Sequence, residues 1–140
     1  MTLTVEVAEN PQACFDIRRK VFIEEQGFTE EEEWDDLDGA AIHLLISDDG
    51  RPVATARLLR QDGVGRIGRI CVLKEGRGKG LGAMLVRHGL EHFRVDPEIA
   101  TVELGAQVHA LGFYEKLGFT AFGEVYLDGT VPHREMRCVL

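Results

Sequence analysis

Four glycines and three basic side chains occur together at residues 74–86, which read KEGRGKGLGAMLV. An apolar stretch typical of a strand precedes them, and an apolar run with helical spacing follows. The first N–H groups of a helix have no partner inside the helix, and the positive end of the helix dipole lies beside them. Glycines let a ligand approach such a backbone closely. This stretch therefore predicts a binding site for phosphate groups.

Two common phosphate-binding patterns fit this stretch poorly. A Walker A loop needs Ser or Thr after its lysine, whereas Lys79 is followed by Gly80. The dinucleotide-binding pattern GxGxxG/A is matched by Gly78, Gly80 and Ala83, which leaves a small NAD-binding protein as an alternative. The same pattern recurs at residues 63–68 ahead of a predicted strand, and only one strand–helix–strand unit surrounds the first match. The pattern is therefore weak evidence.

A third pattern, R/Q-x-x-G-x-G/A, is formed by Arg77, Gly80 and Gly82. Here the sequence resembles the GNAT acyltransferase superfamily, in which such a loop holds the pyrophosphate of coenzyme A. The resemblance covers nearly the whole chain, because its ElaA/YjcF-type branch has segments similar to VFIEEQGF, DLDGAAIH, AQVHALGFYEKLGF and VPHREM. It implies acetyl-CoA as co-substrate, in contact with Ile70, Cys71, Val72, Arg77, Gly78, Lys79, Gly80, Leu81, Gly82, Ala83, Gln107 and Tyr114.

The same resemblance implies attack of a free amine on the thioester. Tyr114 lies where many relatives place a tyrosine near the coenzyme sulfur, so it is our candidate general acid. The alternative is a packing role, because Phe113, Leu117 and Phe119 surround it in the sequence.

Several residues are candidates for the group that takes the amine proton. Glu25 ends the first predicted helix, and His43 carries an imidazole, whose ordinary pKa is close to neutrality. Glu103 is displaced by one position from a glutamate of some relatives, so we expect it to point to the other face of its strand. Ordered water is a further alternative. His109 and His133 are interpreted as hydrogen-bonded structural residues.

The residues that could contact the acceptor include both acidic and basic side chains. Residues 29–36, TEEEEWDD, are interpreted first as a solvated loop and second as a lip that attracts a cationic amine, helped by Glu24. Arg57 and Arg69 instead fit either a substrate carboxylate or pairing with this acidic run. The predicted acceptor is a small-molecule or peptide amine.

Strands and helices alternate in the order that must position these residues. We expect strands at 3–7, 41–47, 52–60, 66–73, 99–104, 120–127 and 132–140, helices at 11–26, 81–93 and 106–118, and a loop at 27–39. This order predicts an α/β fold with a mixed sheet. The resemblance implies one GNAT domain over residues 1–140, whose mostly antiparallel sheet is splayed between its fourth and fifth strands and flanked by helices.

The composition limits the other function classes. The net charge of −8 argues against nucleic-acid binding, and the chain has no apolar run of the ~20 residues that a membrane helix needs. Cys14, Cys71 and Cys138 are scattered, which predicts neither disulfides nor a metal site and fits a reducing cytoplasm. A non-catalytic acyl-CoA-binding module stays open as an alternative, and a homodimer is common in the superfamily.

Overall fold

The computed structural model describes residues 2–140, which form a single seven-stranded sheet in the order β1-β2-β3-β4-β5-β7-β6. The strands are β1 (Leu3–Val7), β2 (Ile42–Asp48), β3 (Arg51–Gln61), β4 (Val64–Val72), β5 (Thr101–Gln107), β6 (Thr120–Asp128) and β7 (Val131–Val139). The helices are α1 (Gln12–Arg18), its π-helical continuation η1 (Arg19–Glu25), α2 (Glu30–Glu33), α3 (Leu81–Arg94) and α4 (Leu111–Glu115). Short 3₁₀ turns lie at η2 (Asp38–Ala40), η3 (Lys74–Gly76) and η4 (Val108–Ala110).

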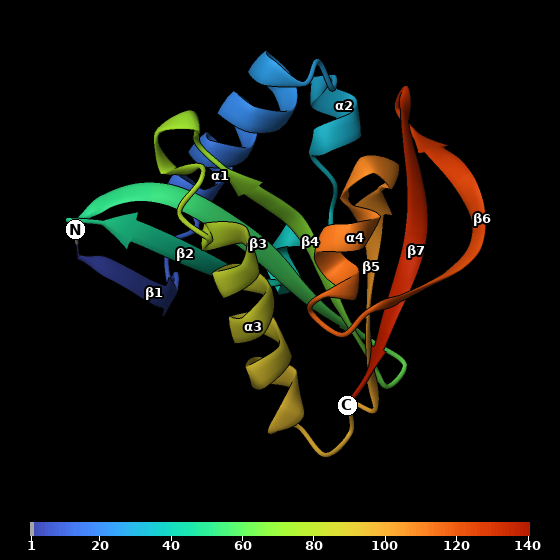
Figure 1. Cartoon of the computed structure of the whole chain (residues 1–140). Helices are drawn as coiled ribbons and strands as arrows, with labels where there is room; N and C mark the ends of the chain where they lie inside the picture. Colours follow the sequence, from blue (N-terminus) through green and yellow to red (C-terminus); the bar gives the residue numbers. More distant parts are fainter. Residues whose placement is uncertain (1) are drawn as a thin grey trace.

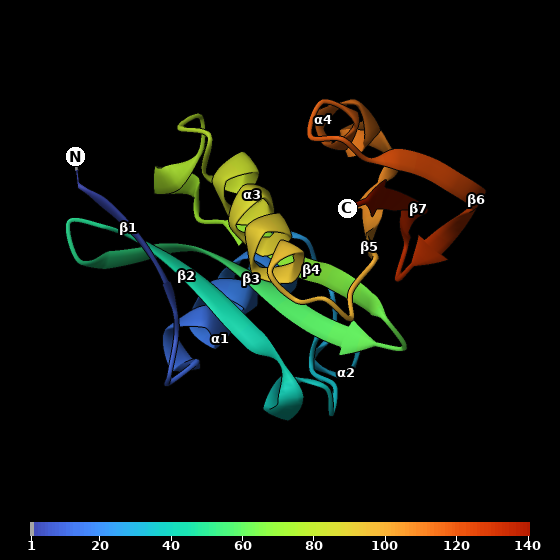
Figure 2. The same cartoon turned by 90° about the horizontal axis from the view of Figure 1, so that it is seen from below.

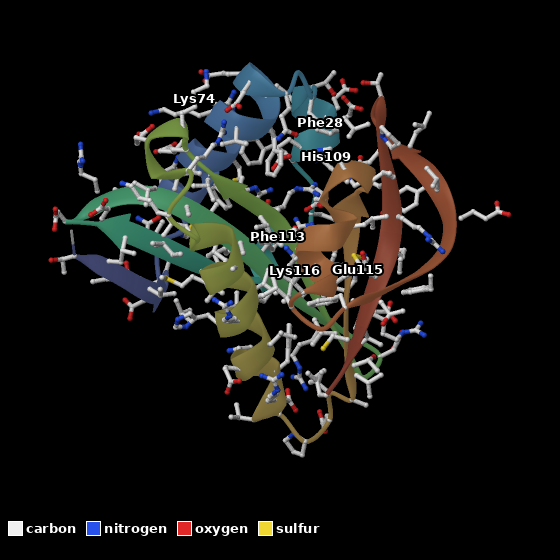
Figure 3. The ribbon with its side chains drawn as sticks, viewed as in Figure 1. Phe28, Lys74, His109, Phe113, Glu115 and Lys116 are labelled. Carbon is white, nitrogen blue, oxygen red and sulfur yellow. The ribbon has the colours of Figure 1, made fainter. Side chains whose placement is uncertain are left out.

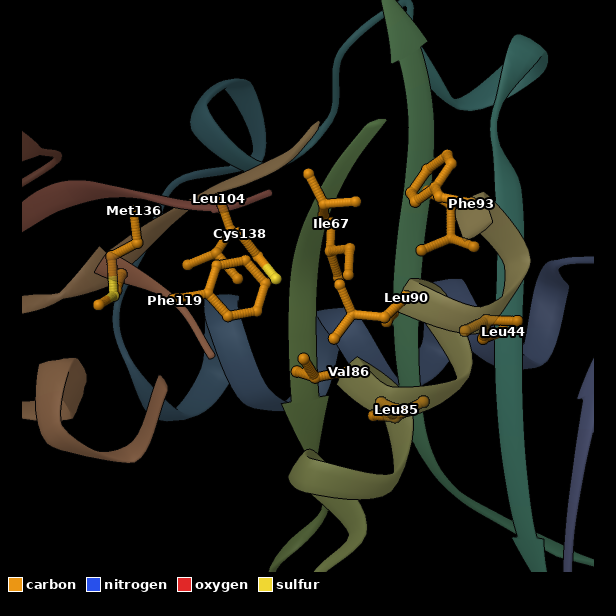
Figure 4. Packing of buried hydrophobic residues seen from close by; sticks show 14 of the residues in the cluster. Leu44, Ile67, Leu85, Val86, Leu90, Phe93, Leu104, Phe119, Met136 and Cys138 are labelled. Carbon is orange, nitrogen blue, oxygen red and sulfur yellow. The ribbon is translucent and has the colours of Figure 1, made fainter. Parts of the chain in front are cut away.

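Helices cover both faces of the sheet. Figure 2 shows α3 on one face of β2–β4 and α1 with α2 on the opposite face. The apolar stripe of α3, including Leu85, Val86, Leu90 and Phe93, is almost fully buried against the sheet. Figure 4 shows this stripe packed on Ile67. The main core thus lies between α3 and the sheet, and the stripe fixes the start of α3 beside the end of β4.

A second, smaller core lies on the other face. Cys14, Ile17 and Val21 from α1 and η1 pack there with Cys71 and Leu73. Side chains alternate between the two faces of a strand. Cys71 accordingly faces α1, whereas Ile70 and Val72 pack against the α3 core. The side chains at the end of β4 thus alternate between the two cores.

The sheet splits between its fourth and fifth strands, as expected. All other neighbouring strands are antiparallel, but β4 and β5 are parallel and pair only over Val64–Arg66 and Thr101–Glu103. Beyond these pairs the two strands diverge, which Figure 1 shows at the upper end of the sheet. An irregularity in the pairing of β3 with β4 adds to this, because Arg69 has a φ of 51° at the point where the register shifts. The edge of β4 that faces β5 is therefore open.

Two predicted elements differ from the structure. The segment 27–39 is not only a loop, because Thr29 and Glu32 form a capping box that starts α2. The helix predicted from residue 106 begins five residues later, at Leu111, because Ala106 and Gln107 continue β5 and pair with β7. Gly118 follows α4 with a φ of 100° and separates it from β6, as expected for a glycine after a helix.

Candidate active site

A cavity of about 310 Å³ occupies the place where β4 and β5 diverge. Its wall includes Ile70 of β4, Gln107 of β5, Tyr114 of α4 and His133 of β7. Phe22, Gln26, Phe28 and Glu32 line it from η1, α2 and the turn between them. Elements from opposite ends of the sequence thus meet at the predicted reaction site. Figure 3 labels Phe28, in the turn that precedes α2.

Tyr114, the candidate general acid, lines this cavity from α4. It is half-buried, and its ring makes edge contacts with Phe113 and Phe119, at 5.0 and 6.2 Å between ring centroids. Loss of hydration raises the pKa of its phenol to about 12, so the group stays protonated near neutral pH. Tyr114 therefore both packs against neighbouring aromatic rings and lines the cavity.

The glycine-rich turn has the backbone geometry of an anion site. Gly78 and Gly80 have φ values of 79° and 76°, and a Cβ on either would contact nothing within 4 Å. Gly80 is the N-cap of α3, and no side chain caps this 14-residue helix. Gly82 faces α4, since its Cβ would lie 3.5 Å from Phe113, which Figure 3 labels. The open space and the uncapped N–H groups fit a pyrophosphate.

Two of the three basic side chains of the turn, Arg77 and Lys79, have protein partners. Arg77 makes a bidentate ion pair with Glu25, with both N–O distances 2.7 Å, and its Nε donates to the Val72 carbonyl. This pair lowers the pKa of the Glu25 carboxyl. The amine of Lys79 lies 3.4 Å from Asp48.

These contacts argue against Glu25 as the base. A carboxylate held by an arginine accepts protons poorly, and Glu25 does not line the cavity of Tyr114. It lies with Glu24 and Lys74 around another hollow of about 460 Å³, next to η3. The structure therefore does not bring Glu24 or Glu25 to the predicted reaction site.

His43 is also separated from this site. Its side chain is buried on β2, its Nε2 donates to the Asp38 carbonyl at 3.0 Å, and its ring packs edge-on against Phe15. It does not line the cavity. The prediction of His43 as a base is therefore not supported, because a base must reach the proton that it removes.

The acidic segment, here residues 29–38, mainly forms ion pairs with buried arginines and is not chiefly a solvated lip. Arg18 is 1% exposed and donates to Glu33 and Asp38, each at 2.8 Å. Arg57 donates to Asp35 at 2.8 Å and to Asp38 at 3.2 Å, and Arg69 lies 3.2 Å from Glu33. Of the two sequence-based alternatives, the structure favours pairing of Arg57 and Arg69 with this segment. Both arginines also line the cavity.

Burial and pairing act in opposite directions on these carboxyl groups. Burial raises the pKa of Glu33 despite its bond to Arg18. Burial would also raise the pKa of Asp38, but the bonds from Arg18 and Arg57 outweigh it and lower the pKa.

Gln107 joins the two sides of the opening. Its amide nitrogen lies 3.3 Å from the side-chain oxygen of Gln26, and its oxygen lies 2.7 Å from Nε2 of His109. Glu103 shares the face of Gly105 and Gln107, so the expectation that it points away was wrong. Arg137 and Arg66 hold its carboxylate at 3.0 and 3.6 Å, away from the cavity wall.

Sequence reasoning missed three features of this region. Arg18 looked like an ordinary polar residue, although it organises the acidic segment. Tyr126 and Glu135 form a 2.7 Å hydrogen bond directly over Gly105, where a Cβ would lie 2.4 Å from the tyrosine oxygen. A glycine inside a strand is the available signal for such a close approach. His133, interpreted as a structural residue, lines the cavity.

Within residues 2–140, no group of three or more His, Cys, Asp or Glu side chains is arranged to hold a metal ion. None of the helices in this range has the length and apolar character needed to cross a membrane.

Comparison with known proteins agrees with this geometry. A family model described as an Acetyltransferase (GNAT) domain matches residues 8–140. The uncharacterized N-acetyltransferase YjcF of Bacillus subtilis is 36% identical over 129 residues, which cover 91% of each chain. The crystal structure of Escherichia coli ElaA superposes with a TM-score of 0.83 at 30% identity over 98% of both chains. An acyl-CoA N-acyltransferase from Pseudomonas aeruginosa gives a TM-score of 0.83 at 32% identity over 99% of both chains. The chain therefore belongs to the GNAT acetyltransferase family, within its ElaA/YjcF-like branch, and is an acyltransferase.

Proposed function

We propose that this protein transfers the acetyl group of acetyl-CoA to a primary amine by direct nucleophilic attack. The observation that carries the proposal is the position of Tyr114. This protonated phenol and the open edge of β4 border the same cavity, which begins where β4 loses its partner strand.

The co-substrate is assigned to the open edge and to the glycine-rich turn. We assign Ile70, Cys71 and Val72, at the end of β4, to the pantetheine arm, because pairing with β5 ends at Arg66; of their backbone groups, the Val72 carbonyl is bonded to Arg77 Nε in this structure. An N–H group near Val72 would polarise the thioester carbonyl. The pyrophosphate would bind the turn Arg77–Ala83, whose glycine backbone and uncapped helix start fit an anion. Gln107 lines the cavity beside this path.

Tyr114 is assigned the role of general acid, which donates a proton to the leaving thiolate. When the amine forms its bond to the carbonyl carbon, the C–S bond breaks and its electrons leave with sulfur. Donation of the phenol proton to that thiolate would lower the barrier. Arg57 and Arg69 are assigned to the wall that receives the acceptor, a small-molecule or peptide amine, because both line the cavity while the acidic segment orients them.

Thermal denaturation with added ligands tests the co-substrate. Acetyl-CoA and CoA are expected to raise the melting temperature, by the equivalent of about 2.7 kcal/mol at a hundred times Kd, whereas NAD and NADH are expected to leave it unchanged. Stabilisation by NAD or NADH alone would contradict the proposal.

Release of CoA thiol with a panel of primary amines tests the reaction. We expect Tyr114→Phe to lower kcat by about 10²-fold or more, while Kd for acetyl-CoA measured by calorimetry stays the same. Wild-type turnover in Tyr114→Phe would show that another group protonates sulfur. A wild-type protein that binds acetyl-CoA but releases no thiol with any amine would instead be the non-catalytic module.

A further inference from the structure

His133 borders the cavity in which the proposed reaction takes place. It is on β7 directly opposite Gln107 of β5, so the two residues are neighbours across the pair of strands. The residue is 7% exposed, and it lines the same cavity as Ile70 and Tyr114. The two residues named from the sequence as bases, Glu25 and His43, do not line this cavity.

The hydrogen bonds of His133 determine which ring nitrogen carries the proton. Its Nδ1 lies 2.8 Å from the Val131 carbonyl, which can only accept, so Nδ1 is the protonated nitrogen. The neutral ring then has a lone pair on Nε2, at its other edge. Within residues 2–140, Nε2 has no hydrogen-bond partner. Since the Nδ1 edge faces the backbone at the start of β7, the Nε2 edge is the one left to the cavity.

A carboxylate and a tyrosine ring lie next to the His133 ring. A carboxylate oxygen of Asp128 lies 4.0 Å from Nε2, and Asp128 also lines the cavity. Tyr126 stacks on the ring at 5.8 Å between centroids, and its hydroxyl is bound to Glu135. No lysine or arginine among the described residues forms an ion pair with Asp128. An imidazolium formed here would thus be next to a free carboxylate.

We propose that His133 is the general base, whose Nε2 takes the proton of the acceptor amine. This role rests on the proposed function. The acceptor ammonium gives one proton to Nε2, and the nitrogen lone pair forms the bond to the thioester carbonyl carbon. The C–S bond breaks, sulfur keeps the electron pair, and Tyr114 gives sulfur its proton. The nitrogen loses its second proton to Tyr114 through solvent, and His133 returns its proton to solvent. The products are one amide, one thiol and one proton.

Matched acceptors separate a base from a residue that only shapes the cavity. Each alkylamine that releases thiol with the wild-type protein is paired with its O-alkylhydroxylamine, whose nitrogen is already neutral at pH 7. With the alkylamine, His133→Asn is expected to lower kcat by about 10²-fold or more. With the hydroxylamine, the loss is expected to stay within about threefold, because no ammonium needs to lose a proton. His88→Asn, an exposed position on α3, serves as the matched control and keeps the wild-type kcat.

The results have distinct meanings. An equal loss with both acceptors, or no loss with either, would overturn the role of His133 while leaving the proposed transferase intact. A wild-type protein that releases no thiol with any amine would overturn both. A second measurement needs no turnover: nitrogen-15 NMR of the wild-type side chain is expected to show Nδ1 protonated and Nε2 bare in the neutral ring. A proton on Nε2 would overturn the proposal even if His133→Asn does not fold.

Discussion

Replacing Arg18 by methionine tests whether the acidic segment is held by its buried ion pairs. The guanidinium donates to Glu33 and Asp38 at 2.8 Å each, and the side chains of Arg18 and Glu33 are only 1% and 4% exposed. Methionine keeps much of the volume and removes the charge. Glu33 then keeps only its contact with Arg69, and Asp38 only its bond from Arg57. In the variant, the carboxylates of Glu33 and Asp38 therefore each lose one of their two arginine partners.

The expected loss follows from this burial. Removing one partner of a buried ion pair costs about 3–5 kcal/mol, because the remaining charge stays desolvated. The unfolding entropy of a chain of 140 residues is ~0.3 kcal/mol per kelvin. The melting temperature should fall by about 10–17 °C. Guanidinium denaturation followed by circular dichroism gives the free energy of unfolding directly.

The neighbouring residue supplies the control. Arg19 pairs with Glu30, but their side chains are 47% and 54% exposed, and such surface pairs contribute about 0–1 kcal/mol. Arg19→Met should therefore cost no more than about 1 kcal/mol. If Arg18→Met costs no more than Arg19→Met, the network does not stabilise the segment and the reasoning fails.

Two further predictions concern a close contact and the response to acid. Gly105→Ala would place a Cβ 2.4 Å from the Tyr126 hydroxyl and 2.9 Å from Glu135, so it should separate this pair and cost about 1–3 kcal/mol in denaturant unfolding. Gly112→Ala is the control, because open space surrounds it within α4 and alanine favours a helix; an equal loss in both variants would refute the steric argument. For the acid response, folding lowers the pKa of Asp38, so its stabilisation is present above the unfolded pKa of about 3.9 and is lost as the pH falls through the folded value. Glu33, with its raised pKa, has the opposite sign and loses its contribution as the pH rises. Denaturant titrations between about pH 5 and 2 should show a shallower decline for Asp38→Asn than for wild type; identical slopes would contradict this assignment.

Local patterns were sufficient for most of the fold. The apolar runs of β2 and β3, which are buried on both faces, the turn residues between them and the apolar stripe of α3 are each determined within a few residues of sequence. The glycine-rich turn was predictable for the same reason, since its backbone geometry depends on Gly78 and Gly80 themselves. The start of α4 was placed too early because β7 holds Ala106 and Gln107 in the sheet. That pairing partner lies more than 25 residues later in the chain, at His133 and Arg134.

The side chains of the site depended on longer-range contacts. Arg18 meets Glu33 and Asp38 only after the chain reverses at residue 27, and Arg57 and Arg69 reach the same carboxylates from two strands. Charge alone left these residues equally suited to bind a substrate. His133 was interpreted as a structural residue, because the sequence does not show that its Nδ1 bonds the carbonyl of Val131, two residues earlier on β7, which leaves Nε2 open. Such a tautomer is a property of the folded strand and not of the residue type.

The buried network has a consequence for engineering the acceptor range. Residues 29–38 present Glu32 and Glu33 to the cavity, so this segment is an obvious part to exchange between related transferases. Yet three arginines, from α1, β3 and β4, form ion pairs with Glu33, Asp35 and Asp38. A transplanted segment without those three carboxylates would leave the arginines without their carboxylate partners. Point substitutions in the cavity wall that keep these carboxylates and the capping residues Thr29 and Glu32 are therefore expected to disturb the fold least.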